Sequence, residues 1–97
     1  MVIWTQRART DLKSIHDYIA KDSHQNARMV INTILQQTST LAQMPHTGKK
    51  VPDLNQNELR EISIYSWRII YHLKQDDIFI VTVIHKRRNA QPHELTP

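Results

Sequence analysis

Hydrophobic positions in the N-terminal half repeat at the spacing of two amphipathic helices. A short apolar stretch at residues 2–4 is followed by Thr5, a residue type that caps helix N-termini. The segment after it carries apolar residues on one face: Ala8, Leu12, Ile15 and Ile19. A second cap at Asp22-Ser23 precedes a longer apolar stripe over residues 27–42. Because so few residues separate the two helices, we expect them to form an antiparallel hairpin.

The C-terminal half alternates in the manner of strands. Residues 59–65 and 67–74 alternate apolar and polar positions, and residues 78–85 are almost wholly apolar, as in a central strand buried on both faces. A tight turn is expected at residues 75–77, and residues 46–58, which contain prolines and asparagines, are expected to form a loop.

The predicted element order is strand, helix, helix, strand, strand, strand. It indicates an α+β fold in one domain over residues 1–97, with the helical hairpin packed on one face of a mainly antiparallel sheet. Since no predicted element remains to cover the other face, we expect that face to stay partly open and to carry the functional surface.

Composition narrows the possible chemistry. The 97-residue chain has no cysteine, which excludes disulfides, thiolate zinc sites and cysteine nucleophiles. Its six histidines show no metal-ligand spacing, and one glycine allows no phosphate-binding loop, so neither a metal nor a cofactor is expected. No apolar run is long enough to span a membrane and no secretory leader is recognisable, so a cytoplasmic location is expected. The net charge of +4 favours acidic partners, either nucleic acid or an acidic protein.

Charged and aromatic residues near the predicted strands are the candidates for function. The densest cationic run is His85-Lys86-Arg87-Arg88, which suits phosphate or carboxylate binding or simply keeps a strand end hydrated. Arg68 lies within a strand, where it points to solvent or pairs with a neighbour such as Glu61, unless it lines the open face with Arg60 and the cationic run. His72 and His85 are structural residues or acid–base groups acting on RNA. The aromatic residues of the strands belong to the core or stack on RNA bases.

Several short motifs, in order along the chain, resemble the RelE/ParE toxin superfamily. The first is Trp4-Thr5-x-x-Ala8-x-x-Asp11-Leu12-x-x-Ile15-x-x-Tyr18-Ile19-Ala20. The others are Leu41-x-x-x-Pro45-x-x-Gly48, Leu59-Arg60-Glu61-Ile62, Trp67-Arg68-Ile69-Ile70-Tyr71 and Val83-Ile84-His85-x-x-Arg88. The resemblance implies the toxin of a prokaryotic type II toxin–antitoxin module, neutralised by a cognate antitoxin. It implies contact with operator DNA only through the toxin–antitoxin complex.

Two activities divide that superfamily: ParE-like members inhibit DNA gyrase and are not enzymes, and RelE-like members cut mRNA. The first and last motifs resemble the ParE-like branch more closely. For this activity we expect target contacts from the cationic run (His85, Lys86, Arg87, Arg88) and Arg60. The alternative is a RelE-like endonuclease that cuts mRNA on the ribosome. In that case Arg68 would stabilise the phosphate charge, His85 or Glu61 would act as base, and Lys86 would be an auxiliary cation.

Two further possibilities remain open: a plain nucleic-acid-binding module, whose affinity would fall steeply with salt, and an inactive toxin that still binds its antitoxin. For the antitoxin we expect a docking groove between the helical hairpin and the sheet, filled by an amphipathic helix or an added strand.

Overall fold

The computed structural model describes residues 1–53 and 58–95. In chain order the elements are β1 (Val2–Trp4), α1 (Gln6–Ala20), α2 (His24–Ser39), the 3-10 turn η1 (Thr40–Ala42), β2 (Lys49–Lys50), β3 (Leu59–Ile64), β4 (Trp67–Lys74), β5 (Asp77–His85) and the 3-10 turn η2 (Pro92–Glu94). The sheet has the order β1-β5-β4-β3-β2. β1 runs parallel to β5, and the other neighbours are antiparallel.

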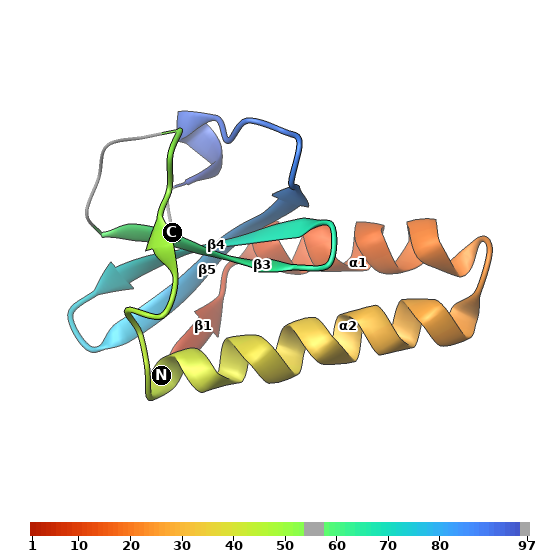
Figure 1. Ribbon diagram of the computed structural model, residues 1–97, viewed down its shortest axis with the longest axis horizontal. Helices are drawn as coiled ribbons and strands as arrows, with labels where there is room; N and C mark the ends of the chain where they lie inside the picture. Colours follow the sequence, from red (N-terminus) through yellow and green to blue (C-terminus); the bar gives the residue numbers. More distant parts are fainter. Residues whose placement is uncertain (54–57, 96–97) are drawn as a thin grey trace.

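The helices α1 and α2 form a hairpin whose apolar faces pack on one side of the sheet (Figure 1). Both predicted caps are present, since the Thr5 hydroxyl accepts from the Ala8 N–H and the Ser23 hydroxyl from the Asn26 N–H. The buried residues of this core include Ile15 from α1, Ile34 from α2, and Ile69, Tyr71 and Ile80 from the sheet. The predicted α+β arrangement is confirmed.

Asp11 joins α1 to the edge of β5. The pairing of β1 with β5 extends only to Trp4 and Ile80, after which the chain turns into α1. Beyond that point the Asp11 carboxylate accepts hydrogen bonds from the Val83 N–H at 3.0 Å and from the Thr82 hydroxyl. A helix side chain therefore satisfies a strand edge that β1 is too short to pair.

The second face of the sheet is covered, so the expectation that it stays open is wrong. A second apolar cluster lies there, formed by Val51, Leu59, Ile70, Val81, Ile84, Ala90 and Leu95. β5 supplies buried side chains to both faces because successive side chains of a strand alternate, and a β-bulge opposite Ile70 and Tyr71 shifts that alternation once. The C-terminal residues supply part of this cover, because Ala90 and Leu95 fold back over the sheet.

The expected loop at residues 46–58 contains a short strand, β2, in which Lys49 and Lys50 pair with Glu61 and Arg60. Part of that loop, residues 54–57, lies outside the described residues. The Tyr71 hydroxyl holds the start of the loop, because it donates to the Pro45 carbonyl at 2.8 Å and accepts from the Gly48 N–H at 2.9 Å. Tyr71 is fully buried and belongs to the core rather than to a base-stacking surface.

Candidate functional site

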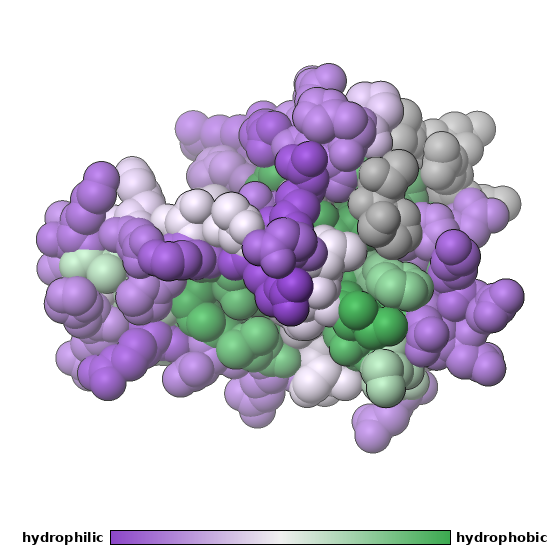
Figure 2. Space-filling model, turned by 180° about the vertical axis from the view of Figure 1, so that it is seen from behind, coloured by the Kyte–Doolittle hydropathy of each residue, from purple (hydrophilic) through white to green (hydrophobic). Residues whose placement is uncertain are grey.

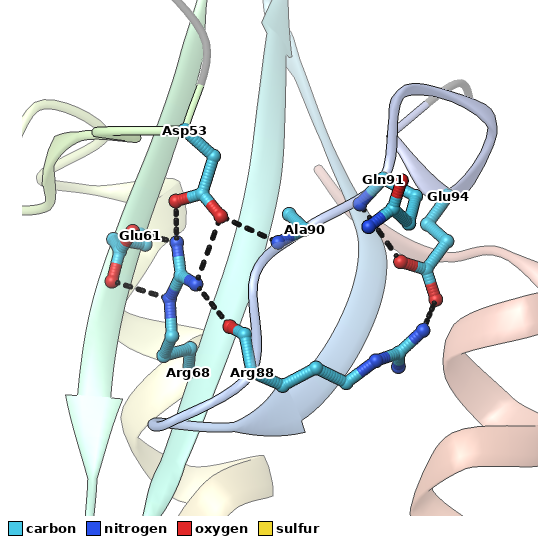
Figure 3. A network of polar contacts seen from close by, with 7 residues as sticks. All are labelled: Asp53, Glu61, Arg68, Arg88, Ala90, Gln91 and Glu94. Atoms are coloured by element: carbon cyan, nitrogen blue, oxygen red, sulfur yellow. Dashed lines mark hydrogen bonds and ion pairs between the residues drawn. The ribbon is translucent and has the colours of Figure 1, made fainter.

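Arg68, on β4, is the centre of an ion network on the second face of the sheet (Figure 3). Its guanidinium donates to both oxygens of Glu61, at 2.7 and 3.1 Å. It also donates to both oxygens of Asp53, at 2.6 and 3.4 Å, and to the Arg88 carbonyl at 2.7 Å. Since arginine has five N–H donors, these five hydrogen bonds use its whole donor set.

The network is buried, since Arg68 is 6% and Glu61 3% exposed. The pairing of Arg68 with Glu61 that the sequence suggested is therefore confirmed. The other interpretation, in which Arg68 lines an open face beside Arg60, is wrong, because Arg68 lies under the folded-back tail. Buried charges persist in proteins when each is paired and hydrogen-bonded, and that condition is met here.

Residues 88–95, which we call the C-terminal strap, are attached to this network through two contacts. The Arg88 carbonyl accepts from Arg68, as described above. The Asp53 carboxylate accepts from the Ala90 N–H. Further along, Glu94 accepts from the Gln91 N–H at 2.9 Å and forms an ion pair with Arg88 at 2.5 Å (Figure 3). Arg88, predicted as a target-binding residue, thus has a partner within the strap.

These contacts shift the acidity of the groups involved. Hydrogen bonds from Arg68 and Ala90 outweigh burial and lower the pKa of Asp53 below its ordinary value. Burial by itself would raise the pKa of Glu94, but the hydrogen bonds from Gln91 and Arg88 outweigh it and lower that pKa too. The pKa of Arg68 is raised, chiefly by Glu61, so its charge is permanent.

The direction of these shifts predicts acid lability. A carboxylate with a lowered folded-state pKa adds stability above its unfolded value, which is 3.8 for Asp53, and loses it as the pH falls through the folded value. We therefore expect the unfolding free energy to drop steeply below about pH 4. Asp53→Asn should cost about 1 kcal/mol at pH 7 and flatten this dependence. Urea titrations at pH 7 and pH 3 test this, with the exposed Asp22→Asn as control; equal pH slopes in wild type and Asp53→Asn would contradict it.

His85 lies on the opposite face of the sheet from Arg68. In the β4–β5 ladder His85 pairs with Trp67, and Arg68 pairs with Ile84, so the two side chains project to opposite sides. The His85 ring contacts the Trp67 ring edge-on at 5.5 Å, and its Nδ1 accepts from the Arg87 N–H at 3.2 Å. His72 pairs with Phe79 far along the same ladder. The structure therefore does not bring His85 to Arg68 and Glu61.

The remaining cations are dispersed. Lys86 and Arg87 are exposed in the turn after β5. Arg60 lies on β3 and donates to the Gly48 carbonyl at 2.9 Å, which fixes it beside β2. Of the predicted target-binding set, the structure groups His85, Lys86 and Arg87 at one end of the sheet and places Arg60 elsewhere.

Asp53 and Glu94 are the network residues that the sequence did not single out. Gln91 and Glu94 have the spacing of a helix capping box, and Glu94 accepts from the Gln91 N–H, but glutamine is not a usual capping residue and gave little signal. Asp53 lies in a segment without periodicity, and only the fold brings it to Arg68. Among the described residues, no group of three or more histidines and carboxylates is arranged to hold a metal ion. None of the described helices combines the length and apolarity needed to cross a membrane.

A groove of about 760 Å³ lies between the C-terminal part of α2 and the β3 edge, on the expected side of the molecule. Gln37, Thr40, Gly48, Lys49 and Ser63 are among its lining residues. β2 pairs with β3 only at Arg60 and Glu61, so the described β3 residues beyond them have no strand neighbour on this side. A smaller apolar depression, of about 400 Å³, lies between the helices, where Leu12 and Ile31 are partly buried. Figure 2 shows hydrophobic side chains over the body of the helical hairpin.

Comparison with known proteins matches this fold to one family. A family model described as the ParE toxin of the parDE type II toxin–antitoxin system matches residues 2–90. A solved structure described as the chromosomal ParDE toxin–antitoxin system from P. aeruginosa is similar, with a TM-score of 0.72 and 22% identity over 87% of this chain and 92% of that chain. No curated protein matches the sequence.

Proposed function

Because this chain belongs to the ParE toxin family of type II toxin–antitoxin systems, we propose that it arrests growth by inhibiting DNA gyrase and that a cognate antitoxin holds it inactive. In this proposal it acts in the cytoplasm by protein contacts, without a cofactor, and reaches operator DNA only through the antitoxin complex.

The hydrogen bonding of Arg68, whose donors all have partners within the protein, is the observation that supports gyrase over the ribosome as the target. An endonuclease that uses the RNA 2′-hydroxyl needs a base at that hydroxyl, a cation at the pentacoordinate phosphate and an acid at the leaving oxygen, all within reach of the same phosphodiester. Every Arg68 donor already has a partner, and Glu61 is 3% exposed with both oxygens bound to Arg68. His85 projects from the other face. This arrangement argues against a nuclease built on Arg68, His85, Glu61 and Lys86.

The groove between α2 and β3 supports the antitoxin proposal. Its lining combines apolar residues such as Leu41 and Ile62 with polar ones, and it includes Ser63 in the β3 segment beyond β2. An extended or helical antitoxin segment would fit such a groove, and an added strand would take its main-chain hydrogen bonds from β3. The exposed Lys49 at the groove suits an acidic antitoxin segment.

A bulky residue in this groove should block antitoxin binding. Thr40 is exposed and lines the groove, so we expect Thr40→Arg to weaken antitoxin binding about tenfold or more while leaving the melting temperature within about 2 °C. Thr10→Arg, at an exposed site on α1 away from the groove, is the matched control. Calorimetric titration with the antitoxin measures both. Wild-type affinity in Thr40→Arg would place the antitoxin elsewhere.

Pulse labelling after induction without antitoxin tests the gyrase proposal in cells. Incorporation of thymidine and of methionine is followed in parallel. We expect DNA synthesis to fail first, with protein synthesis declining later. A collapse of protein synthesis within minutes, while DNA synthesis continues, would refute the gyrase proposal and favour the ribosome.

A further inference from the structure

Two hairpin turns of the sheet hold residues in an unfavourable backbone conformation. Each turn has two residues, Tyr65-Ser66 between β3 and β4 and Gln75-Asp76 between β4 and β5. The first residue of each has a positive φ, 55° for Tyr65 and 57° for Gln75. Glycine, asparagine and aspartate are the usual residues there, and a bulky side chain at positive φ is strained.

Tyr65 gains no burial in return for this strain. Its side chain is 58% exposed, and it is not part of either apolar cluster. Strain alone does not mark a functional residue, because Gln75 carries the same strain. Tyr65 differs in placing a large aromatic side chain in solvent at its turn, which favours a role in binding. The presence of tyrosine at this turn therefore calls for a function outside the core.

The surroundings of Tyr65 supply that function. The Lys86 N–H donates to the Ser66 carbonyl at 2.8 Å, which places the turn after β5 beside the Tyr65 turn. Trp67 and His85 are cross-strand partners at the same end of the sheet, and both are partly buried. The exposed Lys86 and Arg87 complete the group. We call these five residues the sheet-end surface: Tyr65, Trp67, His85, Lys86 and Arg87.

We propose that the sheet-end surface, with Tyr65 as its anchor, binds an acidic patch on the protein that this toxin inhibits. Exposed tyrosine, tryptophan and arginine are the residues that carry most of the energy in protein interfaces, and two cations beside them select a negatively charged partner. The identity of the partner as gyrase rests on the function proposed above, whereas the surface itself does not.

A nucleic-acid strand fits this surface less well than a protein. Strand-binding sites stack successive bases on several free rings along a basic groove that spans about four or more nucleotides. Here the Trp67 ring packs on the core between the helical hairpin and the sheet, and against His85. Tyr65 is therefore the exposed ring of the group. Only two exposed cations, Lys86 and Arg87, belong to this surface.

The two strained turns provide a matched pair of variants. Tyr65→Gly and Gln75→Gly each relieve a positive φ, so both should keep the melting temperature or raise it by up to about 5 °C. Tyr65→Gly should lose growth arrest and bind its target about 30-fold more weakly, as expected for loss of an interface anchor. Gln75→Gly should arrest growth like wild type. Both should still be bound by the antitoxin with wild-type affinity.

A charge reversal tests the same surface independently. The double variant Lys86→Glu/Arg87→Glu should also lose growth arrest. Lys21→Glu/Arg28→Glu makes the same charge change at exposed sites on the helical hairpin, and it should remain active. Growth arrest is scored as colony counts after induction, with protein levels measured in parallel and melting temperatures measured on purified protein.

Several outcomes would overturn the proposal. Growth arrest equal to wild type in both Tyr65→Gly and the Lys86/Arg87 variant would show that the sheet-end surface does not bind the target. A loss of arrest accompanied by a melting temperature well below that of Gln75→Gly would make Tyr65 a structural residue. Weakened antitoxin binding in these variants would show that the surface binds the antitoxin instead of the target. Binding of single-stranded DNA by wild type that falls in the same variants would show that it binds nucleic acid. If wild type arrests growth without inhibiting gyrase, only the gyrase assignment fails, because the contrast between the two glycine variants still tests the surface.

Discussion

Arg68→Ala should lower the unfolding free energy by about 3–5 kcal/mol, the range for breaking a buried ion pair by removing one partner. The substitution leaves Glu61 and Asp53 as buried carboxylates without their common cation. It also removes the donor to the Arg88 carbonyl, so the C-terminal strap loses a main attachment. For a domain of this size, such a loss is a large share of the total stability.

A urea titration of Arg68→Ala measures this effect, and two controls make it specific. Arg9→Ala removes an exposed arginine on α1 and should change stability by less than about 0.5 kcal/mol. The double variant Glu61→Gln/Arg68→Met should be more stable than Arg68→Ala, because it removes one of the stranded charges. A catalytic Arg68 would give the opposite pattern: a stable, inactive protein. Wild-type stability of Arg68→Ala would therefore refute the network as a structural element.

Tyr71→Ala should be comparably damaging, at about 3–5 kcal/mol, because it empties a fully buried aromatic site in the first core. Tyr71→Phe separates the ring from its hydroxyl. It keeps the packing but leaves the buried Gly48 N–H without its partner, so we expect a loss of about 1–3 kcal/mol.

The close approach of Gly48 to Tyr71 gives this prediction a second test. A Cβ at position 48 would lie 2.5 Å from the Tyr71 hydroxyl oxygen and 2.6 Å from the Glu61 carbonyl oxygen, so Gly48→Ala should destabilise by about 1–3 kcal/mol. Part of that overlap disappears when the hydroxyl is removed. The Gly48→Ala/Tyr71→Phe double variant should therefore lose less stability than the sum of the single variants. Strict additivity in urea titrations would show that the two residues are not coupled.

The fold was predictable because its elements carry local signals. Thr5 and Ser23 are standard helix caps, and β4 has the predicted bounds, Trp67–Lys74. The strap was missed for the opposite reason. Ala90 and Leu95 are isolated apolar residues among polar ones, and their burial depends on the pairing of Arg68 with Asp53, which no local pattern encodes.

The candidate site was only partly readable for a similar reason. The sequence identified Arg68 and Glu61 as possible partners, because they lie on neighbouring strands. It did not place His85 on the other face, although the alternation of the ladder decides this once the register is known. The strain at Tyr65 was also hidden, because a positive φ arises from the two-residue turn, and the sequence there lacks the glycine or asparagine that marks such turns.

The most direct measurement of the central claim is a supercoiling assay with purified gyrase, relaxed plasmid and ATP. The toxin is added from equimolar to tenfold excess, and the plasmid topology is resolved on gels. We predict that supercoiling is inhibited and that equimolar antitoxin restores it. Full supercoiling at tenfold excess, with the same preparation stopping translation in a cell extract, would contradict the account.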